Sequence, residues 1–441
     1  MAIDNIRAYS HLSDEDIEEI GRRLDAIKQE VEASLGERDV AYIKGLIRFQ
    51  RGLEVAARAT LLFSHKRACF WAGSGMLALS KILENMEIGH NVIHGQWDWM
   101  NDPEIHSTTW EWDMTCPSSQ WMHSHNFVHH KYTNIIGMDN DVGYGILRVT
   151  RDRAWTPAHA FQPVTNVVLA SLFQWAIAFY DVELGRYFAG KQTWEETAPR
   201  FWEAVRKSRN QVLKDYALYP ALSGPNYFNT VAANATANWL RSVWAYAVIF
   251  CGHFPDEAET FTKEQLRTES HAEWYLRQML GSANFHGGKL LTILSGNLNY
   301  QIEHHLFPDM PSNRLAEVGK QVQQLAEEFD LPYNVDSFPM QFLKVQRTLL
   351  KLTLPNRFLV ASPHNAPEVR SNKAFTENPQ IEQQLHVGAD EHGVRRGLKK
   401  GLKLLKAIRP GAREVVNCYL GRGVRGTESV AASQPEKLSK T

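Results

Sequence analysis

Uncharged and charged stretches alternate along the 441 residues of this chain. Residues 154–180 contain no Asp, Glu, Lys or Arg, and residues 216–255 contain only Arg241. A stretch of about 18 or more apolar residues is long enough to cross a bilayer as a helix. The pattern therefore predicts membrane segments at 156–180 and 216–252, separated by a charged, helical stretch at 184–215.

An earlier pair of apolar segments occupies residues 45–83. A short turn at residues 64–67 joins the two segments, which predicts a helical hairpin. The first segment, about 45–63, carries Arg48, Arg51, Glu54 and Arg58, and each charge at a bilayer centre costs about 2.5–3.5 kcal/mol. Such a helix must either pack against other helices with its cations reaching the interface, or lie in the interface. With the two later segments, the pattern favours about four spanning helices.

The N-terminal residues predict a packing helix. After a cap-like start at Ser13, apolar residues recur at helical spacing, namely Ile17, Ile20, Leu24, Ile27, Val31 and Leu35. The first 40 residues are charged and show no apolar core of a cleavable signal peptide. We therefore expect residues 1–44 to form an amphipathic cytosolic segment.

The C-terminal residues predict a linker and a basic tail. Residues 361–393 are rich in Asn, Pro, Glu and Gln, a composition typical of a linker. Residues 394–425 hold ten Lys or Arg against one acid, and four apolar residues recur there at helical spacing. Two interpretations of the tail, 394–441, stay open: an amphipathic helix on anionic lipid, or a solvated segment. The main domain is then 45–360.

Composition narrows the function classes. The chain has 48 Lys or Arg and 49 Asp or Glu, so its net charge of −1 gives no field that would attract nucleic acid. Its mean hydropathy of −0.37 is low for a membrane protein, but this average hides a strong concentration of apolar residues in a few segments. The four cysteines show no spacing typical of a metal site, and a disulfide is not expected in a protein that faces the cytosol.

Histidines form three spaced clusters, with one more histidine between the second and third. They are His90 and His94, then His125, His129 and His130, then the isolated His253, and finally His304 and His305. Imidazole is the commonest side-chain metal ligand and suits iron, zinc and copper. Eight imidazoles exceed the four positions of one tetrahedral zinc, so two metal ions are the simplest stoichiometry.

The spacing within the clusters has a physical meaning. On a helix, residues four apart share a face, so His90 and His94 can bind one ion, and so can His125 and His129. Adjacent residues point about 100° apart, so His304 and His305 can address two different ions, as can His129 and His130. The second cluster, with its adjacent pair, is expected only about 0.03 times by chance.

These motifs resemble those of the membrane fatty acid desaturases. The resemblance is carried by the three clusters and by GNLNYQIEHHLFP at residues 296–308. EIGHNVIHGQWDWMNDP at 87–103 and residues 246–255 are more narrowly similar to the acyl-CoA desaturases of mycobacteria and other actinobacteria. The resemblance covers roughly residues 1 to 360. It implies an all-α integral membrane protein, with a helical stem of about four spanning helices and a cytosolic helical cap that holds a diiron centre.

The resemblance also implies roles for single residues. The histidines of the three clusters match the family's metal ligands one for one, and His253 matches the isolated histidine after the last spanning helix. Gln301 stands where some relatives place a histidine, and we expect it to be a hydrogen-bonding or weak ligand. Asn297 is expected to hold a metal-bound water or to orient a ligand histidine. Asp98, Asp102, Asp139 and Asp141 are weighed as groups that orient ligands, with turn chemistry the preferred interpretation of Asp139 and Asp141.

The activity that the resemblance implies is oxidative. Two Fe ions, O2 and two external electrons remove two hydrogens from neighbouring methylenes of an acyl chain and leave a cis double bond. The narrower similarity favours stearoyl-CoA as substrate and insertion at carbon 9. The Gln-first third cluster also occurs in front-end and acyl-lipid desaturases, and a related diiron hydroxylase uses similar clusters. Trp97, Trp99, Trp110, Trp112 and Trp121 could line the acyl tunnel, although core packing is the preferred interpretation.

Partners and location follow from the same reasoning. The sequence has no haem or nucleotide-binding fingerprint, so electrons must come from a separate NAD(P)H-dependent reductase or ferredoxin. Positive residues near the spans favour a cytoplasmic metal site, in a bacterial cell membrane. Lys131, Arg148 and Arg151 lie between the second cluster and an apolar span. We expect them either to bind the coenzyme A phosphates or to flank a spanning helix, and we prefer the second.

Overall fold

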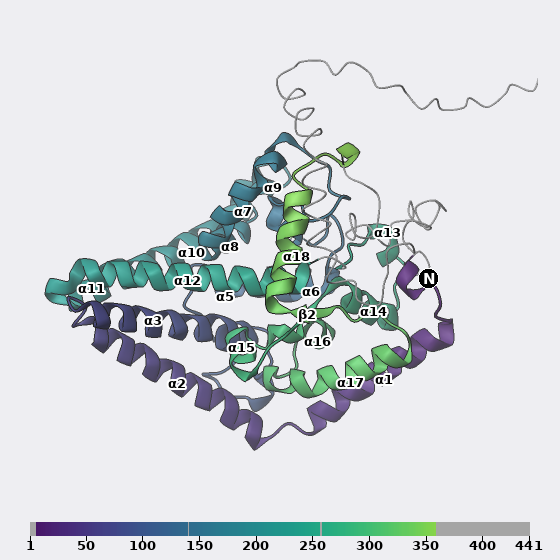
Figure 1. The fold of residues 1–441 in the computed structure, drawn as a ribbon, viewed down its shortest axis with the longest axis horizontal. Coiled ribbons are helices and arrows are strands. Elements are labelled where there is room, and N and C mark those ends of the chain that lie inside the picture. The colour runs from purple at the N-terminus through teal and green to yellow at the C-terminus, as the bar shows by residue number, and fades with distance from the viewer. Residues whose placement is uncertain (1–5, 140, 256–257, 359–441) are drawn as a thin grey trace, which may run out of the picture. The chain divides into compact units, whose positions relative to one another are not determined.

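The computed structural model describes residues 6–139, 141–255 and 258–358, all of which belong to one compact unit. These residues are mainly helical, which confirms the predicted helical class (Figure 1). The exception is a pair of three-residue strands, β1 (Asn284–His286) and β2 (Val335–Ser337), which pair in parallel with Asn284 opposite Val335. The expected linker, 361–393, and basic tail, 394–441, lie outside the described residues.

The N-terminal helix α1 (Asp14–Ala33) forms as its pattern predicts. Ser13 and Asp16 make a reciprocal capping box at its start, which satisfies two backbone N–H groups that would otherwise lack a partner. Its buried face packs on α14 (His271–Gly281) and α17 (Leu315–Glu328). The contact with α14 is close, because a Cβ added at Gly21 would lie 2.6 Å from the Cβ of Ala272.

The hairpin expected at 45–83 is present as α2 (Glu37–Leu61) and α3 (Arg67–Leu83). The two helices approach closely at Gly73, where an added Cβ would lie 2.7 Å from Leu61 Cγ. Helix α2 begins at Glu37, after a break at Gly36 where the Asp39 carboxylate accepts the backbone N–H of Gly36. The boundary that we placed between residues 44 and 45 therefore falls inside a helix.

The expected segment at 216–252 forms the 27-residue helix α12 (Tyr227–His253), which packs along α3 (Figure 1). The segment at 156–180 is instead broken into α7 (Gln162–Ser171) and α8 (Phe173–Tyr180), and the chain bends by 94° between residues 157–171 and 173–180. By length and composition, no single helix of the described residues could cross a membrane, and only this bent pair could do so together. The expected count of four spanning helices is therefore not confirmed.

The charged stretch at 184–215 is helical as predicted and contains α9 (Leu184–Phe188) and α10 (Trp194–Leu213). Helix α10 starts with a capping box between Thr193 and Glu196. The other helices are short, apart from the last one: α4 (Asn91–Ile93), α5 (Ser118–Trp121), α6 (His130–Tyr132), α11 (Tyr219–Leu222), α13 (Lys263–Leu266), α15 (Lys289–Leu294), α16 (Gln301–Leu306) and α18 (Phe338–Lys351).

Two hydrophobic cores meet at the histidines. One core holds the C-terminal end of α12, with Phe250 and Cys251 buried next to His253. The other packs α1, α14 and α17 together and includes Ile302 and Leu306, which flank the third histidine cluster on α16. The residues on α12 and α16 that carry the chemistry are thus held between two well-packed regions.

Candidate metal centre

His90, His125 and His129 lie on π-helical segments. The segment Glu84–His90 (η2) continues α3 into the first cluster, and Met122–His129 (η4) carries most of the second. Single π-turns within helices are rare, and those that occur are often found at functional sites. His253 ends α12, and the third cluster lies on α16.

The structure brings these histidines into two main groups, and His125 and His129 form a third, overlapping set with Asp141. One ring nitrogen from each of His90, His94, His125 and His304 lies within 4.8 Å of the others, and the same holds for His129, His253 and His305. The neighbours His304 and His305 thus point into different groups, as their adjacency predicts. His125 and His129 fall into different groups of histidines, but together with Asp141 they also form a set whose ligand atoms lie within 4.8 Å of one another, which is compatible with the expectation that they can share one ion.

His130 lies between the two groups. Its ring centroid is 4.7 Å from that of His94, 4.9 Å from that of His304 and 4.4 Å from that of His305. Its two ring nitrogens are buried and have no hydrogen-bond partner among the described residues. His130 is therefore within reach of either group.

Many of the buried ring nitrogens lack a partner. Within the described ranges, no hydrogen bond satisfies at least one ring nitrogen of His94, His125, His129, His130, His253, His304 and His305. A buried polar atom without a partner typically costs about 1–3 kcal/mol, so a cluster of them requires an explanation. Coordination of two metal ions satisfies these nitrogens, and imidazole donors suit iron. The residues therefore fit a two-metal centre.

Carboxylates hold two of the rings from behind. Nδ1 of His129 lies 3.0 Å from Asp139 Oδ2, and Nδ1 of His125 lies 3.3 Å from Asp141 Oδ2. Such contacts fix the tautomer and the orientation of a ligand ring. Asp139 also accepts the backbone N–H groups of Asn134 and Asp141, so it performs turn chemistry as well. From the sequence we preferred turn chemistry for Asp139 and Asp141, and this interpretation was incomplete because both carboxylates also contact candidate ligand histidines.

Three orienting groups were not found from the sequence. His305 Nδ1 lies 3.2 Å from Thr133 Oγ1 and 3.1 Å from Gln278 Oε1, and His90 Nδ1 lies 3.0 Å from Asn91 Oδ1. The positions of Asn91 and Thr133, one and three residues after a histidine, offered a weak signal. Gln278 offered none, because α14 reaches the site only through tertiary packing.

Gln301 and Asn297 have different surroundings. The side-chain amide of Gln301 lies 3.2 Å from His253 Nε2. Gly252 makes this contact possible, since an added Cβ there would lie 2.7 Å from Gln301 Cγ. Asn297 instead donates to the buried carboxylate of Glu87 at 2.9 Å, which also accepts the hydroxyls of Tyr42 and Ser312. Its role as a group that orients a histidine stays a prediction.

Burial and mutual repulsion keep most of the rings neutral. Burial, followed by the charge of neighbouring rings, holds the pKa of His94, His125, His130 and His304 well below the usual range. His129 is the exception, because the Asp139 carboxylate outweighs burial and raises its pKa. Since a metal binds the neutral imidazole, the first group is ready for ligation without loss of a proton.

An apolar cavity reaches the histidines. It is lined on one side by His90, His125, His253 and Gln301. The other lining is largely apolar: Met86, Trp112, Met114, Trp121, Tyr144, Phe173, Ile177, Tyr180, Ala245, Ile249 and Leu298, with the polar Asn85, Ser124, Asp141 and Asp181. Of the five tryptophans weighed as tunnel residues, only Trp112 and Trp121 line it.

Other residues singled out from the sequence lie away from the centre. His123 is exposed beside Phe127. Asp98 accepts hydrogen bonds from the backbone and hydroxyl of Ser107, and Asp102 pairs with Lys44 at 2.8 Å. These two carboxylates serve turns and surface pairs, and the histidine that Asp98 approaches is His106, which belongs to neither metal group.

The basic residues after the second cluster differ in exposure. The guanidinium of Arg148 is buried and donates to the backbone carbonyls of Arg153, Leu352 and Leu354. The expectation that Arg148 binds a substrate phosphate does not fit this geometry, because its donors are already used within the fold. Lys131 is exposed and Arg151 is half-buried.

Comparison with known proteins agrees with these motifs. The family model described as fatty acid desaturase matches residues 68–337. The chain is 50% identical over 419 residues to the NADPH-dependent stearoyl-CoA 9-desaturase of Mycobacterium tuberculosis, covering 94% of this chain and 97% of that protein. It is 24% identical to the sn-1 linoleoyl-lipid 6-desaturase of Synechocystis, over 60% of this chain and 74% of that protein. The human fatty acid desaturase 3 is 25% identical over about half of each chain.

Proposed function

This chain belongs to the fatty acid desaturase family, and from that premise we propose that it converts stearoyl-CoA to oleoyl-CoA by inserting a cis double bond at carbon 9. The observation that carries the proposal is the apolar cavity that leads directly to His90, His125 and His253. A hydrocarbon chain is the ligand that such a lining favours, because an apolar wall gains free energy by excluding water.

The histidines would hold two iron ions. His90, His94, His125 and His304 would bind one, and His129, His253 and His305 the other, with His130 in reach of both. When bound, the irons supply the activation of O2 that removal of hydrogen from an unactivated methylene requires. Asp139, Asp141, Thr133 and Gln278 fix the directions of the ligand rings.

The cavity wall performs the second task, which is to position the acyl chain. The apolar wall beside the histidines includes Trp112, Met114, Phe173 and Ile177. A wall of this kind excludes water and presents one pair of methylenes to the metal centre, so that position along the chain decides where the double bond forms. The chain contributes binding and orientation, whereas the bound metals contribute the redox chemistry.

The electrons would come from a separate protein. The M. tuberculosis relative is named as NADPH-dependent, and this chain has no sequence fingerprint for a haem or a nucleotide. We expect the purified chain, supplied with stearoyl-CoA, O2 and NADPH alone, to be inactive until a reductase system is added. Turnover by the chain alone would show that it contains a redox site of its own.

We also propose that the protein works in the cell membrane, with the histidines facing the cytoplasm. The region of α7 supports this, because Val164, Val167 and Val168 on the helix, and Leu172 directly after it, are at least half exposed. Exposed apolar patches of this kind mark membrane or protein contacts. Recovery of the expressed protein in the membrane fraction, resistant to high-salt washing, would support the proposal, and recovery in the supernatant would contradict it.

Product analysis tests the proposed reaction. The full chain is expressed in a desaturase-deficient host with its reductase, and fatty acids are analysed by mass spectrometry with location of the double bond. We expect 18:1 with a cis bond at carbon 9, and no product from the His304→Ala variant. A hydroxylated product would identify a hydroxylase instead. Unsaturation of intact lipids by isolated membranes to which no acyl-CoA is added would identify an acyl-lipid desaturase.

A further inference from the structure

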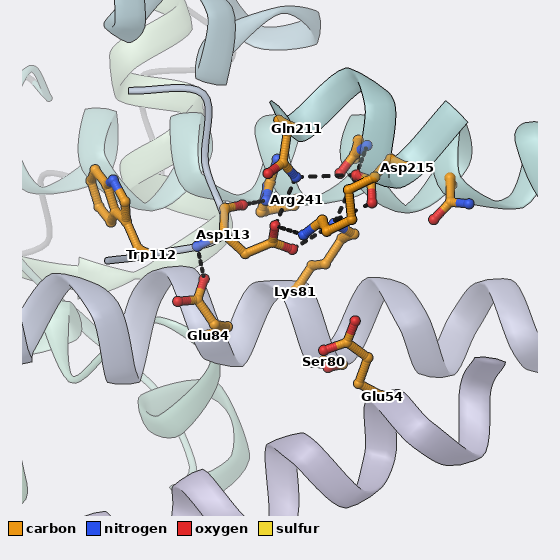
Figure 2. A network of polar contacts seen from close by, with 12 residues as sticks. Glu54, Ser80, Lys81, Glu84, Trp112, Asp113, Gln211, Asp215 and Arg241 are labelled. Atoms are coloured by element: carbon orange, nitrogen blue, oxygen red, sulfur yellow. Dashed lines mark hydrogen bonds and ion pairs between the residues drawn. The ribbon is translucent and has the colours of Figure 1, made fainter. Parts of the chain in front are cut away.

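A second buried polar cluster lies beside the cavity, and the chemistry proposed above does not use it. Lys81 on α3 contacts Asp113 at 2.6 Å and Asp215 at 3.1 Å, and Lys81 and Asp215 are almost completely buried (Figure 2). Gln211 donates to both carboxylates, at 2.7 Å and 3.1 Å. Arg241 on α12 and Lys214 also bind Asp113, through its carbonyl and its carboxylate respectively. We call these residues the ion network.

The ion network holds the segment that forms one wall of the cavity. Asp113 stands between Trp112 and Met114, and both of these line the cavity. Its backbone N–H donates to Glu84 at 3.0 Å, while its carbonyl accepts from Arg241. Residue 113 is therefore fixed through its side chain and through both backbone groups, which leaves its two neighbours little freedom to move.

The network also joins the other elements that line the cavity. Arg241 donates to the side chain of Gln174 on α8, whose carbonyl accepts the hydroxyl of Thr115 at 2.6 Å. Gln174 follows Phe173, a cavity residue. Three walls of the cavity, from the segment 112–116, α8 and α12, thus share one set of polar contacts.

The network is remote from the histidines along the helices. Arg241 precedes His253 by twelve residues on α12, which corresponds to about 18 Å at 1.5 Å per residue. Lys81 precedes His90 by nine residues, and the last seven of these form the π-helical segment η2. The cavity residues Ala245 and Ile249 lie on α12 between Arg241 and His253. Along α12, the cavity therefore extends from the histidines toward the network.

Beyond Trp112 lies a second, more open space. This groove is lined by Trp112 itself and by charged or polar residues, including Glu84, Asp113, Lys207 and Lys214. Lys207 Nζ donates to the carbonyl of Trp112 at 2.8 Å, from the groove side. Trp112 thus borders both spaces, and the wall that it forms separates an apolar cavity from a polar one.

We propose that the ion network fixes the wall at Trp112 and Met114 and thereby sets the longest acyl chain that the cavity accepts. The inference rests on the proposed function, since it assigns the cavity to an acyl chain. Lys81, Asp113 and Arg241 are positioning residues, which act on the substrate through Trp112 and Met114. Charged and polar residues, including Glu84, Asp113, Lys207 and Lys214, lie behind the wall, so a longer chain meets a fixed, polar end.

Competition among chain lengths tests this inference. Membranes that contain the full chain and its reductase receive equimolar palmitoyl-, stearoyl- and arachidoyl-CoA, and product ratios are measured by mass spectrometry. For Trp112→Ala we expect the ratio of 20-carbon to 18-carbon product to rise about tenfold or more, because one methylene in a fitted pocket is worth about 10- to 200-fold. Asp113→Asn and Lys81→Met should shift the ratio in the same direction, and Lys81→Arg should restore it toward wild type.

A ratio is insensitive to the amount of active enzyme, so partial misfolding does not imitate the effect. Arg314→Met is the matched control, because Arg314 and Asp39 form another buried pair, at 2.6 Å, that lines no part of the cavity. We expect it to lower yield without changing the ratio. Wild-type product ratios in Trp112→Ala, Asp113→Asn and Lys81→Met would overturn this inference and leave the proposed function intact. If the wild type desaturates none of the acyl-CoA substrates, the proposed function itself is overturned.

Discussion

The cavity borders two buried polar clusters, and the two are satisfied in different ways. In the ion network, Lys81, Asp113 and Gln211 contact one another or Asp215 within 3.1 Å. At the histidines, many buried ring nitrogens have no partner within the described residues. A cluster whose charged groups are paired with one another, with Asp215 Oδ1 as the exception that lacks a hydrogen bond within the described residues, is suited to hold structure, whereas a cluster with many unused ligand atoms is suited to bind a ligand. The difference therefore assigns positioning to the first and metal binding to the second.

The largest expected effect tests the unsatisfied cluster directly. His304→Ala removes a ring that belongs to the first group and lies between His90, His94 and His130. We expect desaturation to fall to background, with iron content reduced from about two per chain, since His304 would be one of the ligands of its ion. His123→Ala is the matched control, because His123 is exposed and outside both groups. Wild-type turnover in His304→Ala would remove this residue from the ligand set.

Removal of the metal should separate the two clusters. Stripping iron with a chelator leaves the buried imidazoles without partners, so we expect the melting temperature to fall and to recover on addition of Fe(II). Iron at about 100 times its Kd would stabilise the folded state by about 2.7 kcal/mol. Asp113→Asn should start from a lower melting temperature yet show the same iron-dependent increase. Identical melting of stripped and loaded wild type would contradict a metal role for the histidines.

A smaller effect is expected from a group behind the ligands. Asp139→Asn keeps the shape of the side chain but replaces the carboxylate that contacts His129 Nδ1 at 3.0 Å. Loss of such a partner typically reduces metal affinity about 10- to 100-fold. Iron titration of the stripped protein measures this change, with Asp102→Asn as control, because Asp102 pairs with Lys44 at the surface. Equal iron affinities in the two variants would show that Asp139 stabilises only the backbone turn and does not support the ligand His129.

The two clusters also differ in how far the sequence reveals them. The histidines recur at four-residue and adjacent spacings, so local geometry was enough to predict that His304 and His305 separate into two groups. The four-residue spacing predicted that His125 and His129 could bind one ion, and they do share a set with Asp141. It did not predict that each also joins a different group of histidines, because the segment is π-helical, with its backbone hydrogen bonds shifted by one residue. The ion network is built from single charges on segments far apart in the chain, and no periodicity connects Lys81 with Asp113 or Arg241.

The fold shows the same limit. Amphipathic spacing found α1, and the short turn after residue 63 found the hairpin of α2 and α3. An absence of charges at 156–180 did not predict the 94° bend next to Leu172, because an apolar composition is compatible with a straight or a broken helix. The helical class could be predicted, whereas the number of spanning helices could not be confirmed.

The smallest expected effect concerns three cations that differ in burial. Arg148 is buried and bonded to backbone carbonyls, whereas Lys131 is exposed and Arg151 half-buried. If Lys131 and Arg151 contact the coenzyme A phosphates, replacing both by Gln should raise KM for stearoyl-CoA about two- to fivefold, since an exposed ion pair contributes about 0.2–1 kcal/mol. Added salt should weaken binding by the wild type more than by the double variant. Arg148→Gln should instead lower the melting temperature and leave the salt dependence unchanged, because its loss strands buried carbonyls. A double variant with wild-type KM and salt dependence would assign these two cations to the flank of a membrane segment.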